Sequence, residues 1–199
     1  MVSDFVVGLD DDDEQNYPRI DGVMYEVGKR NYMIATLNEI AMKYVDKYLF
    51  LTFLGDDNIV TTEGWDVAMS VTLAKQGYGI AYGNDHLQED KLPTSIMITS
   101  NIVKALGFMA PPTQKHLYAD NFWQVLGKGL GSLYYFPSVH WEHLHFINGK
   151  AEKDLIYEEA NSKKRYDQDR KAFIKYMKNN YVDDVTRVKE ALGVQSEVQ

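Results

Sequence analysis

The stretch that decides the fold is Tyr48-Leu49-Phe50-Leu51-Thr52-Phe53-Leu54-Gly55-Asp56-Asp57-Asn58. Its first seven residues form a nearly unbroken apolar run, which is typical of a strand buried on both faces of a sheet. In α/β sheets, ligands bind where such strands end, and here the end carries two adjacent carboxylates. A sharp turn at Gly55 would let Asp56 and Asp57 face one ligand, such as a hard divalent cation. The alternative is a solvated turn, because Gly, Asp and Asn are ordinary turn residues.

Two other predicted strands end in the same way. Residues 4–9 run into Asp10-Asp11-Asp12-Asp13-Glu14, and residues 78–82 run into Gly83-Asn84-Asp85. Five consecutive acidic side chains repel one another, so such a run is either a solvated loop or a site that a cation neutralises. Its position after a strand favours the second interpretation.

Helical periodicity alternates with these strands. Helices are predicted over residues 31–45, 65–73 with a stop at Gly77, 101–106 with a stop at Gly107, and 118–130, and further strands over residues 95–99 and 133–136. Strands that alternate with helices indicate an α/β fold. We therefore expect a mostly parallel central sheet flanked by helices.

The composition limits the classes of function. The chain has 199 residues, which suits one α/β domain, and its hydrophobic fraction of 45% excludes a disordered chain. A formal charge of −8 argues against nucleic acid as a partner. There is no cysteine, no apolar stretch as long as a membrane span and no signal-peptide pattern. These features predict a soluble, cytoplasmic protein.

The charged composition beyond Gly149 suggests two parts. We expect a core domain over residues 1–149 and a helical extension over residues 150–199, with its helix spanning residues 151–180. The extension would pack as a lid, serve as an arm for a homo-oligomer or only wrap the core.

Histidine is concentrated in one short segment. Three of the five histidines are His140, His143 and His145, close to the end of a predicted strand. Neutral imidazole is a common metal ligand, and His143 and His145 would lie on one face of an extended segment. They are therefore the favoured histidine ligands. The alternative is a group of core or surface histidines beside Trp141.

Asp120 stands at the start of the predicted helix 118–130. A carboxylate in this position can simply cap the helix. It can also be a general base, because a base needs only one carboxylate within hydrogen-bond reach of the acceptor hydroxyl. The neighbouring Tyr118, Phe122 and Trp123 would then form an aromatic platform or, alternatively, part of the core.

The order of these motifs resembles the nucleotide-sugar glycosyltransferases of the GT-A fold, particularly those of the family 2 type. The resemblance covers about residues 4 to 146. The matching stretches are Val6-Val7-Gly8-Leu9-Asp10-Asp11-Asp12-Asp13, Lys29-Arg30-Asn31, Phe53-Leu54-Gly55-Asp56-Asp57, Glu63-Gly64-Trp65, Leu106-Gly107-Phe108 and Ala119-Asp120-Asn121. The resemblance implies a single Rossmann-like GT-A domain.

The resemblance also implies roles for individual residues. Asp10, Asp12, Arg30 and Asp56 would contact the nucleotide sugar, with a uridine diphosphate sugar favoured as donor. Asp57, together with His143 and His145, would hold Mn²⁺ or Mg²⁺, and Asp120 would be the catalytic base. The implied activity is transfer of the sugar to an acceptor hydroxyl with inversion, and a retaining transfer is the alternative.

Three features depart from the family pattern. The motif reads Gly-Asp-Asp instead of Asp-x-Asp, Ala119 replaces the expected Glu, and the family's first strand and helix have no counterpart. We therefore expect a minimal or N-terminally truncated form. Two other functions use the same acidic turns: a nucleotidyl or phosphoryl transferase, and a non-catalytic module that binds nucleotide sugars.

Overall fold

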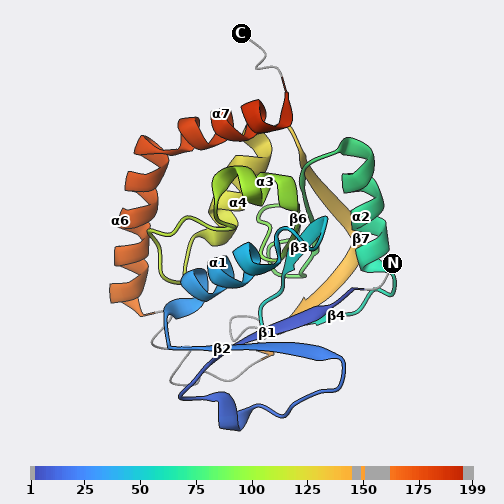
Figure 1. Cartoon of the computed structure of the whole chain (residues 1–199), viewed down its shortest axis with the longest axis vertical. Coiled ribbons are helices and arrows are strands. Elements are labelled where there is room, and N and C mark those ends of the chain that lie inside the picture. Colours follow the sequence, from blue (N-terminus) through green and yellow to red (C-terminus); the bar gives the residue numbers. More distant parts are fainter. Residues whose placement is uncertain (1–2, 145–148, 151–161, 195–199) are drawn as a thin grey trace.

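The computed structural model describes residues 3–144, 149–150 and 162–194 (Figure 1). The chain is a mixed α/β protein with the following elements: β1 (Phe5–Asp10), η1 (Glu14–Asn16), β2 (Val23–Gly28), α1 (Tyr32–Tyr44), β3 (Phe50–Phe53), β4 (Asn58–Val60), α2 (Trp65–Gln76), β5 (Ile80–Asn84), β6 (Ile96–Thr99), α3 (Ser100–Leu106), α4 (Ala119–Gly129), β7 (Leu133–His143), α6 (Lys163–Asn179) and α7 (Tyr181–Leu192). The strands β2 and β4 were not predicted from the sequence. The expected α/β class is confirmed.

The main sheet has the strand order β3-β6-β5-β7-β4, and it is not mostly parallel as predicted. Only β5 and β7 pair in parallel, whereas β3 with β6, β5 with β6 and β4 with β7 are antiparallel. The short connection from β5 to β6 contains no helix, and a parallel pair needs a crossover of a dozen or more residues that usually includes one. The chain therefore returns antiparallel at this point.

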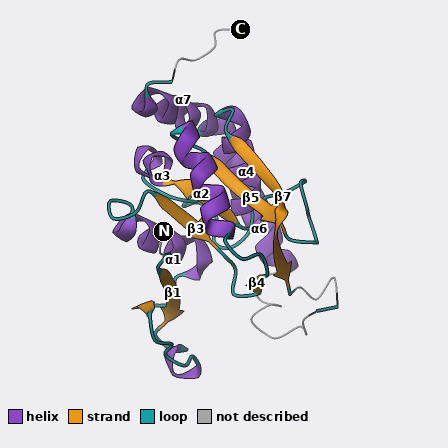
Figure 2. Cartoon of the chain, turned by 90° about the vertical axis from the view of Figure 1, so that its right-hand side faces the viewer, coloured by secondary structure: helices purple, strands orange, loops and turns teal. Residues whose placement is uncertain are grey.

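The strands β1 and β2 form a separate parallel pair. Figure 2 shows β1 below the five-stranded sheet, with α1 beside it. Of the six residues of β1, Leu9 is buried and Phe5 is 52% exposed. The first acidic run thus leaves a small outer sheet and not the central one.

The apolar run ending at Leu54 was expected to be buried on both faces, and this expectation is wrong. As β3, it is the edge strand of the main sheet and pairs only with β6. Leu49 is 79% exposed, and Phe50 and Leu51 are only partly buried. An edge strand has a neighbour on one side only, which leaves part of its apolar surface open.

The helices predicted within residues 31–130 are confirmed, including the glycine stops of α2 and α3. Of the helix predicted over residues 151–180, α6 (Lys163–Asn179) is present, and residues 151–161 lie outside the described residues. Gly77 and Gly107 both have φ of +80°, a left-handed conformation that ends a helix at low cost only for glycine. The central strands β5 and β6 are buried along almost their whole length. The largest fully buried side chains include Phe122, Trp123 and Trp141, which place the core between α4 and the sheet.

The described part of the C-terminal extension consists of α6 and α7, which meet at Asn180. Figure 1 shows α7 across one end of the molecule, over α3 and α4. Val188 is fully buried and Tyr176 is 6% exposed, both in the same core cluster as α3 and α4. These helices therefore wrap the core. Within the described residues, none of the helices has the length and apolar character needed to cross a bilayer.

Candidate functional site

The second acidic turn, Gly55-Asp56-Asp57-Asn58, is compact and directs the Asp57 carboxylate inward. Asn58 donates its backbone N–H to the Gly55 carbonyl at 3.1 Å, and its side chain donates to Asp57 Oδ1 at 2.7 Å. A Cβ on Gly55 would lie 2.5 Å from that same Asp57 oxygen. A larger residue at position 55 would therefore displace the Asp57 carboxylate, which occupies the space of its side chain.

His143 joins Asp57 through the pairing of β4 with β7. Asn58 lies opposite His143 in this antiparallel ladder, and the Leu144 N–H donates to the Asp57 carbonyl at 2.7 Å. His143 Nε2 lies 3.0 Å from Asp57 Oδ2, and His143 Nδ1 lies 3.4 Å from Asp85 Oδ2. The imidazole thus bridges two carboxylates that follow different strands.

Asp85 was recognised in the sequence only as part of an acidic strand end, without a role. It is 1% exposed. Its Oδ2 accepts the Thr94 hydroxyl at 2.8 Å, and its Oδ1 accepts three backbone N–H groups, those of Leu87 (3.0 Å), Gln88 (2.7 Å) and Glu89 (2.9 Å). A carboxylate held by so many donors is fixed in place, so it can orient the His143 ring.

The pKa values reflect this linkage. Burial alone raises the pKa of Asp57 and of Asp85, but the hydrogen bond to His143 and, for Asp85, the backbone donors outweigh burial and hold both pKa values below the ordinary range. Burial lowers the pKa of His143, and the two carboxylates more than reverse this, raising it to about 9. The metal-free cluster therefore contains an imidazolium between two carboxylates at neutral pH.

Asp57 Oδ2 and His143 Nε2 also have the spacing of two neighbouring metal ligands. Adjacent ligands of an octahedral ion at about 2.1 Å lie about 3 Å apart. A carboxylate on the other ring nitrogen, the position of Asp85, is the usual support of a metal-binding histidine. No third His, Asp or Glu completes a metal-binding group within residues 3–144, 149–150 and 162–194. The pair fits a Mg²⁺ or Mn²⁺ ion that takes its remaining ligands from phosphate and water.

The structure brings together one further predicted pair, at the first acidic run. Arg30 Nε lies 3.8 Å from Asp10 Oδ2, while Asp12 is exposed. Partial burial and the neighbouring Asp12 raise the pKa of Asp10, and Arg30 opposes this. The run leaves β1 through turns in which Asp13 donates its N–H to the Asp10 carbonyl. Within the described residues, no hydrogen bond or ion pair joins Asp10 or Asp12 directly to Asp57.

The other predicted residues lie apart from the bridge. Asp56 is exposed and, in the part of the chain that the structure describes, makes no hydrogen bond or ion pair. His140 stacks on His86 with ring centroids 5.0 Å apart, on the opposite face of β7 from His143. His145, predicted as a metal ligand, lies outside the described residues.

Asp120 is the second residue of α4, after an N-cap at Tyr118. Its Oδ1 accepts the neighbouring Asn121 N–H at 2.8 Å, so it does not act as the helix N-cap. Burial raises the pKa of this half-buried carboxylate. Asp120 forms no ion pair with any residue that the structure describes, and a carboxylate with a raised pKa fits a general base.

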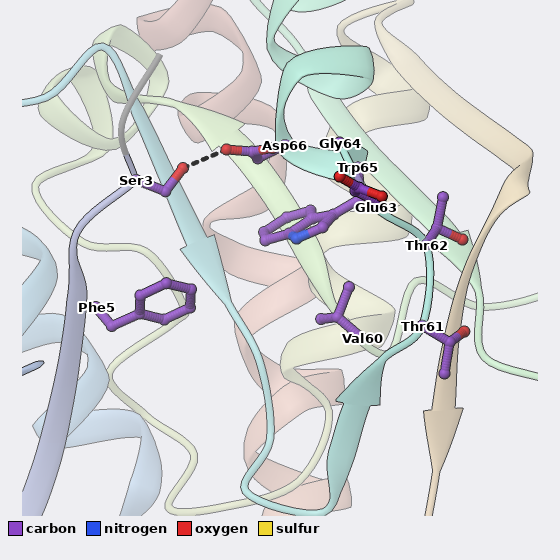
Figure 3. A pocket seen from close by; sticks show the side chains of 9 residues that line it. All are labelled: Ser3, Phe5, Val60, Thr61, Thr62, Glu63, Gly64, Trp65 and Asp66. Atoms are coloured by element: carbon purple, nitrogen blue, oxygen red, sulfur yellow. Dashed lines mark hydrogen bonds between the residues drawn. The ribbon is translucent and has the colours of Figure 1, made fainter. Parts of the chain in front are cut away.

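A concavity of about 520 Å³ lies at the far end of β4 from Asp57 (Figure 3). Phe5 and Trp65 contribute apolar surface, and Ser3 Oγ donates to Asp66 Oδ2 at 2.5 Å. Its full lining is Ser3, Phe5, Val60, Thr61, Thr62, Glu63, Gly64, Trp65 and Asp66. It includes none of the predicted site residues.

The fold and the site define a mixed α/β protein in which a histidine links two acidic strand ends. Comparison of the chain with known protein families, curated proteins and solved structures finds no match. The functional conclusion therefore depends on the geometry of Asp57, Asp85 and His143.

Proposed function

We propose that this chain is a metal-dependent glycosyltransferase with a minimal GT-A core, which moves a sugar from a nucleotide diphosphate sugar to an acceptor hydroxyl. The observation that carries the proposal is the 3.0 Å approach of His143 Nε2 to Asp57 Oδ2, with Asp85 on the other ring nitrogen. This arrangement suits a divalent ion that also binds phosphate oxygens. The favoured donor is a uridine diphosphate sugar.

Asp57 and His143 would hold Mn²⁺ or Mg²⁺, and the ion would neutralise charge on the departing diphosphate. Asp85 Oδ2 would accept the hydrogen bond from the proton-bearing Nδ1 of His143, which would leave the lone pair of Nε2 for the ion. Asp10, Asp12, Arg30 and Asp56 remain proposed contacts of the nucleotide sugar. The C-terminal helices remain a proposed surface for a second copy.

Asp120 is the proposed base. It would accept the proton of the acceptor hydroxyl as that oxygen attacks the anomeric carbon, and the bond to the diphosphate would break on the opposite face. Its raised pKa favours proton uptake. A single displacement of this kind inverts the configuration of the sugar.

The test of the function is a panel of nucleotide sugars and nucleoside triphosphates, each with and without Mn²⁺, read by calorimetry and by product analysis. The proposal expects binding of diphosphate sugars only with metal, and loss of this binding in Asp57→Asn but not in Asp21→Asn, an exposed control. Metal-dependent turnover of triphosphates alone would instead establish a nucleotidyl or phosphoryl transferase. Binding without transfer to any acceptor would establish a non-catalytic module.

The test of the base is Asp120→Asn. Loss of general-base assistance lowers turnover by about 10²- to 10⁴-fold while donor affinity stays nearly constant. The amide keeps the shape and the hydrogen bond from Asn121, so thermal stability should be unchanged. Turnover near that of the wild type would remove Asp120 from the mechanism, and a product with retained anomeric configuration would exclude inversion.

A further inference from the structure

Two cations converge on a single tyrosine near the start of α1. Lys115 Nζ lies 4.3 Å from the centroid of the Tyr32 ring, and the Arg165 guanidinium carbon lies 4.5 Å from it. Tyr32 is the first residue of α1, Lys115 lies in the loop before α4, and Arg165 is in the first turn of α6. Three segments far apart in the sequence thus meet here.

Buried contacts fix these three segments. Asp169 of α6 is 2% exposed, and its carboxylate accepts three backbone N–H groups, those of Lys115 (3.2 Å), His116 (3.0 Å) and Leu117 (3.0 Å). The Ile34 N–H of α1 donates to the Lys115 carbonyl at 3.1 Å. The backbone that carries both cations is therefore held rigidly.

Tyr32 itself is held in an uncommon conformation. Its φ is +63°, in the left-handed region that costs a non-glycine residue about 1 kcal/mol or more. Strained residues of this kind persist where the surrounding structure holds them and are frequent at ligand sites. Tyr32 is 39% exposed, and in this conformation its ring lies within 4.5 Å of both cations.

The buried Asp169 carboxylate accepts backbone N–H groups and not the charged ends of the two cations. In the described ranges, neither Lys115 nor Arg165 forms an ion pair with a carboxylate. Hydrogen bonding from Arg165, and then from Lys115, lowers the pKa of the Tyr32 hydroxyl. Lys115 and Arg165 thus create a local positive potential on a chain with a formal charge of −8. Such a potential favours binding of an anion.

His116 connects this group to the second acidic turn. Burial lowers the pKa of His116, Arg165 acts in the same direction, and Asp56 and Asp57 oppose it. The imidazole is thus within electrostatic range of Arg165 and of the Asp56–Asp57 turn.

We propose that Lys115, Arg165 and the Tyr32 hydroxyl form a binding site for the diphosphate group of a nucleoside diphosphate. Guanidinium groups bind phosphate through two parallel N–H bonds, Lys adds a second charge, and the phenol donates a further hydrogen bond. That the bound diphosphate belongs to a nucleotide sugar rests on the proposed function. The expected affinity for a diphosphate group rests only on Tyr32, Lys115 and Arg165.

The test uses inorganic pyrophosphate and the full-length chain in EDTA, with binding measured by calorimetry. We expect Lys115→Gln and Arg165→Gln each to weaken binding about tenfold or more, since a hydrogen bond to a charged group contributes about 1.5–3 kcal/mol. Lys164→Gln removes an exposed cation from the same turn of α6 and should have no effect. Arg165→Lys keeps the charge but loses the guanidinium fork, so it should recover only part of the affinity.

Thermal melting of each variant shows whether the fold is intact. A further variant, Tyr32→Phe, keeps the ring and removes only the hydroxyl, so it tests the hydrogen bond from the phenol to pyrophosphate. Pyrophosphate affinity in Lys115→Gln and Arg165→Gln equal to that of Lys164→Gln would overturn the proposal. If the wild type transfers sugar and both variants keep full donor affinity, the site fails while the glycosyltransferase stands. If both variants lose pyrophosphate and the wild type transfers no sugar, the site stands and the glycosyltransferase fails.

Discussion

The turns after β1 and β3 look alike in sequence and differ in structure. Each follows a strand and carries adjacent carboxylates. After β3, Asp57 is half-buried, hydrogen-bonded by Asn58 and bridged by His143 to the buried Asp85. After β1, Asp12 is exposed and Asp10 has a cation 3.8 Å away.

The difference comes from the neighbouring strand. The turn after β3 leads into β4, whose partner β7 carries His143 at the facing position. The turn after β1 belongs to a two-stranded sheet whose partner residue at Asp10 is Gly28, which has no side chain to contribute. A run of carboxylates becomes a preorganised site only where another element supplies the groups that hold it.

The sharpest test of this contrast compares Asp57→Asn with Asp12→Asn. Loss of a charged ligand should lower Mn²⁺ affinity by about 100-fold in Asp57→Asn, whereas the exposed Asp12 should change it less than about twofold. Calorimetric titration with Mn²⁺ measures both. Equal losses would mean that the two turns act only through diffuse charge.

The role of Asp85 is tested by Asp85→Asn. The amide oxygen can keep the three backbone donors, but its NH₂ group would face His143 Nδ1 and move the ring proton to Nε2, the metal-facing atom. We expect Mn²⁺ affinity to fall about 10- to 100-fold, with the change of tautomer visible in ¹⁵N NMR of the metal-free protein at a pH above the His143 pKa of about 9, where the ring is neutral. Thr94→Val removes the other partner of the same oxygen and should leave the tautomer unchanged.

The bridge also predicts how stability depends on pH in the absence of metal. The folded pKa of His143 is about 9, above its ordinary value of 6.5. Its contribution is therefore fully present below pH 6.5 and is lost as pH rises through 9. Urea unfolding in EDTA should show a loss of about 2 kcal/mol over this window in the wild type. If the free energy of unfolding falls with pH as steeply in His143→Gln as in the control His86→Gln, the pH dependence comes from groups other than His143.

The smallest expected effect on Mn²⁺ affinity comes from adding one methyl group beside each turn. In Gly55→Ala the new Cβ would lie 2.5 Å from Asp57 Oδ1, so the carboxylate must shift away from His143. In Gly28→Ala, beside the first turn, the Cβ would meet nothing within 4 Å. We expect Mn²⁺ affinity to fall about fivefold, or about 1 kcal/mol, in the first variant only. Unchanged affinity in Gly55→Ala would show that the turn adjusts freely.

The local elements of this protein could be predicted from its amino-acid sequence. Helical periodicity and the stops at Gly77 and Gly107 located α2 and α3, because a helix and its glycine cap depend on residues a few positions apart. The same local patterns placed acidic groups after β1, β3 and β5. They also marked His143 as a candidate metal ligand, but they did not show that it approaches Asp57.

Only the tertiary structure decided which of these groups meet. Asp57 and His143 are 86 residues apart, and Asp85 joins them only because β5 lies beside β7 in the sheet. The tertiary structure also set the direction of β6, which makes the sheet mixed. It likewise brought Lys115 and Arg165 together at Tyr32. Strand order and register depend on burial over the whole core, and no local pattern of residues encodes them.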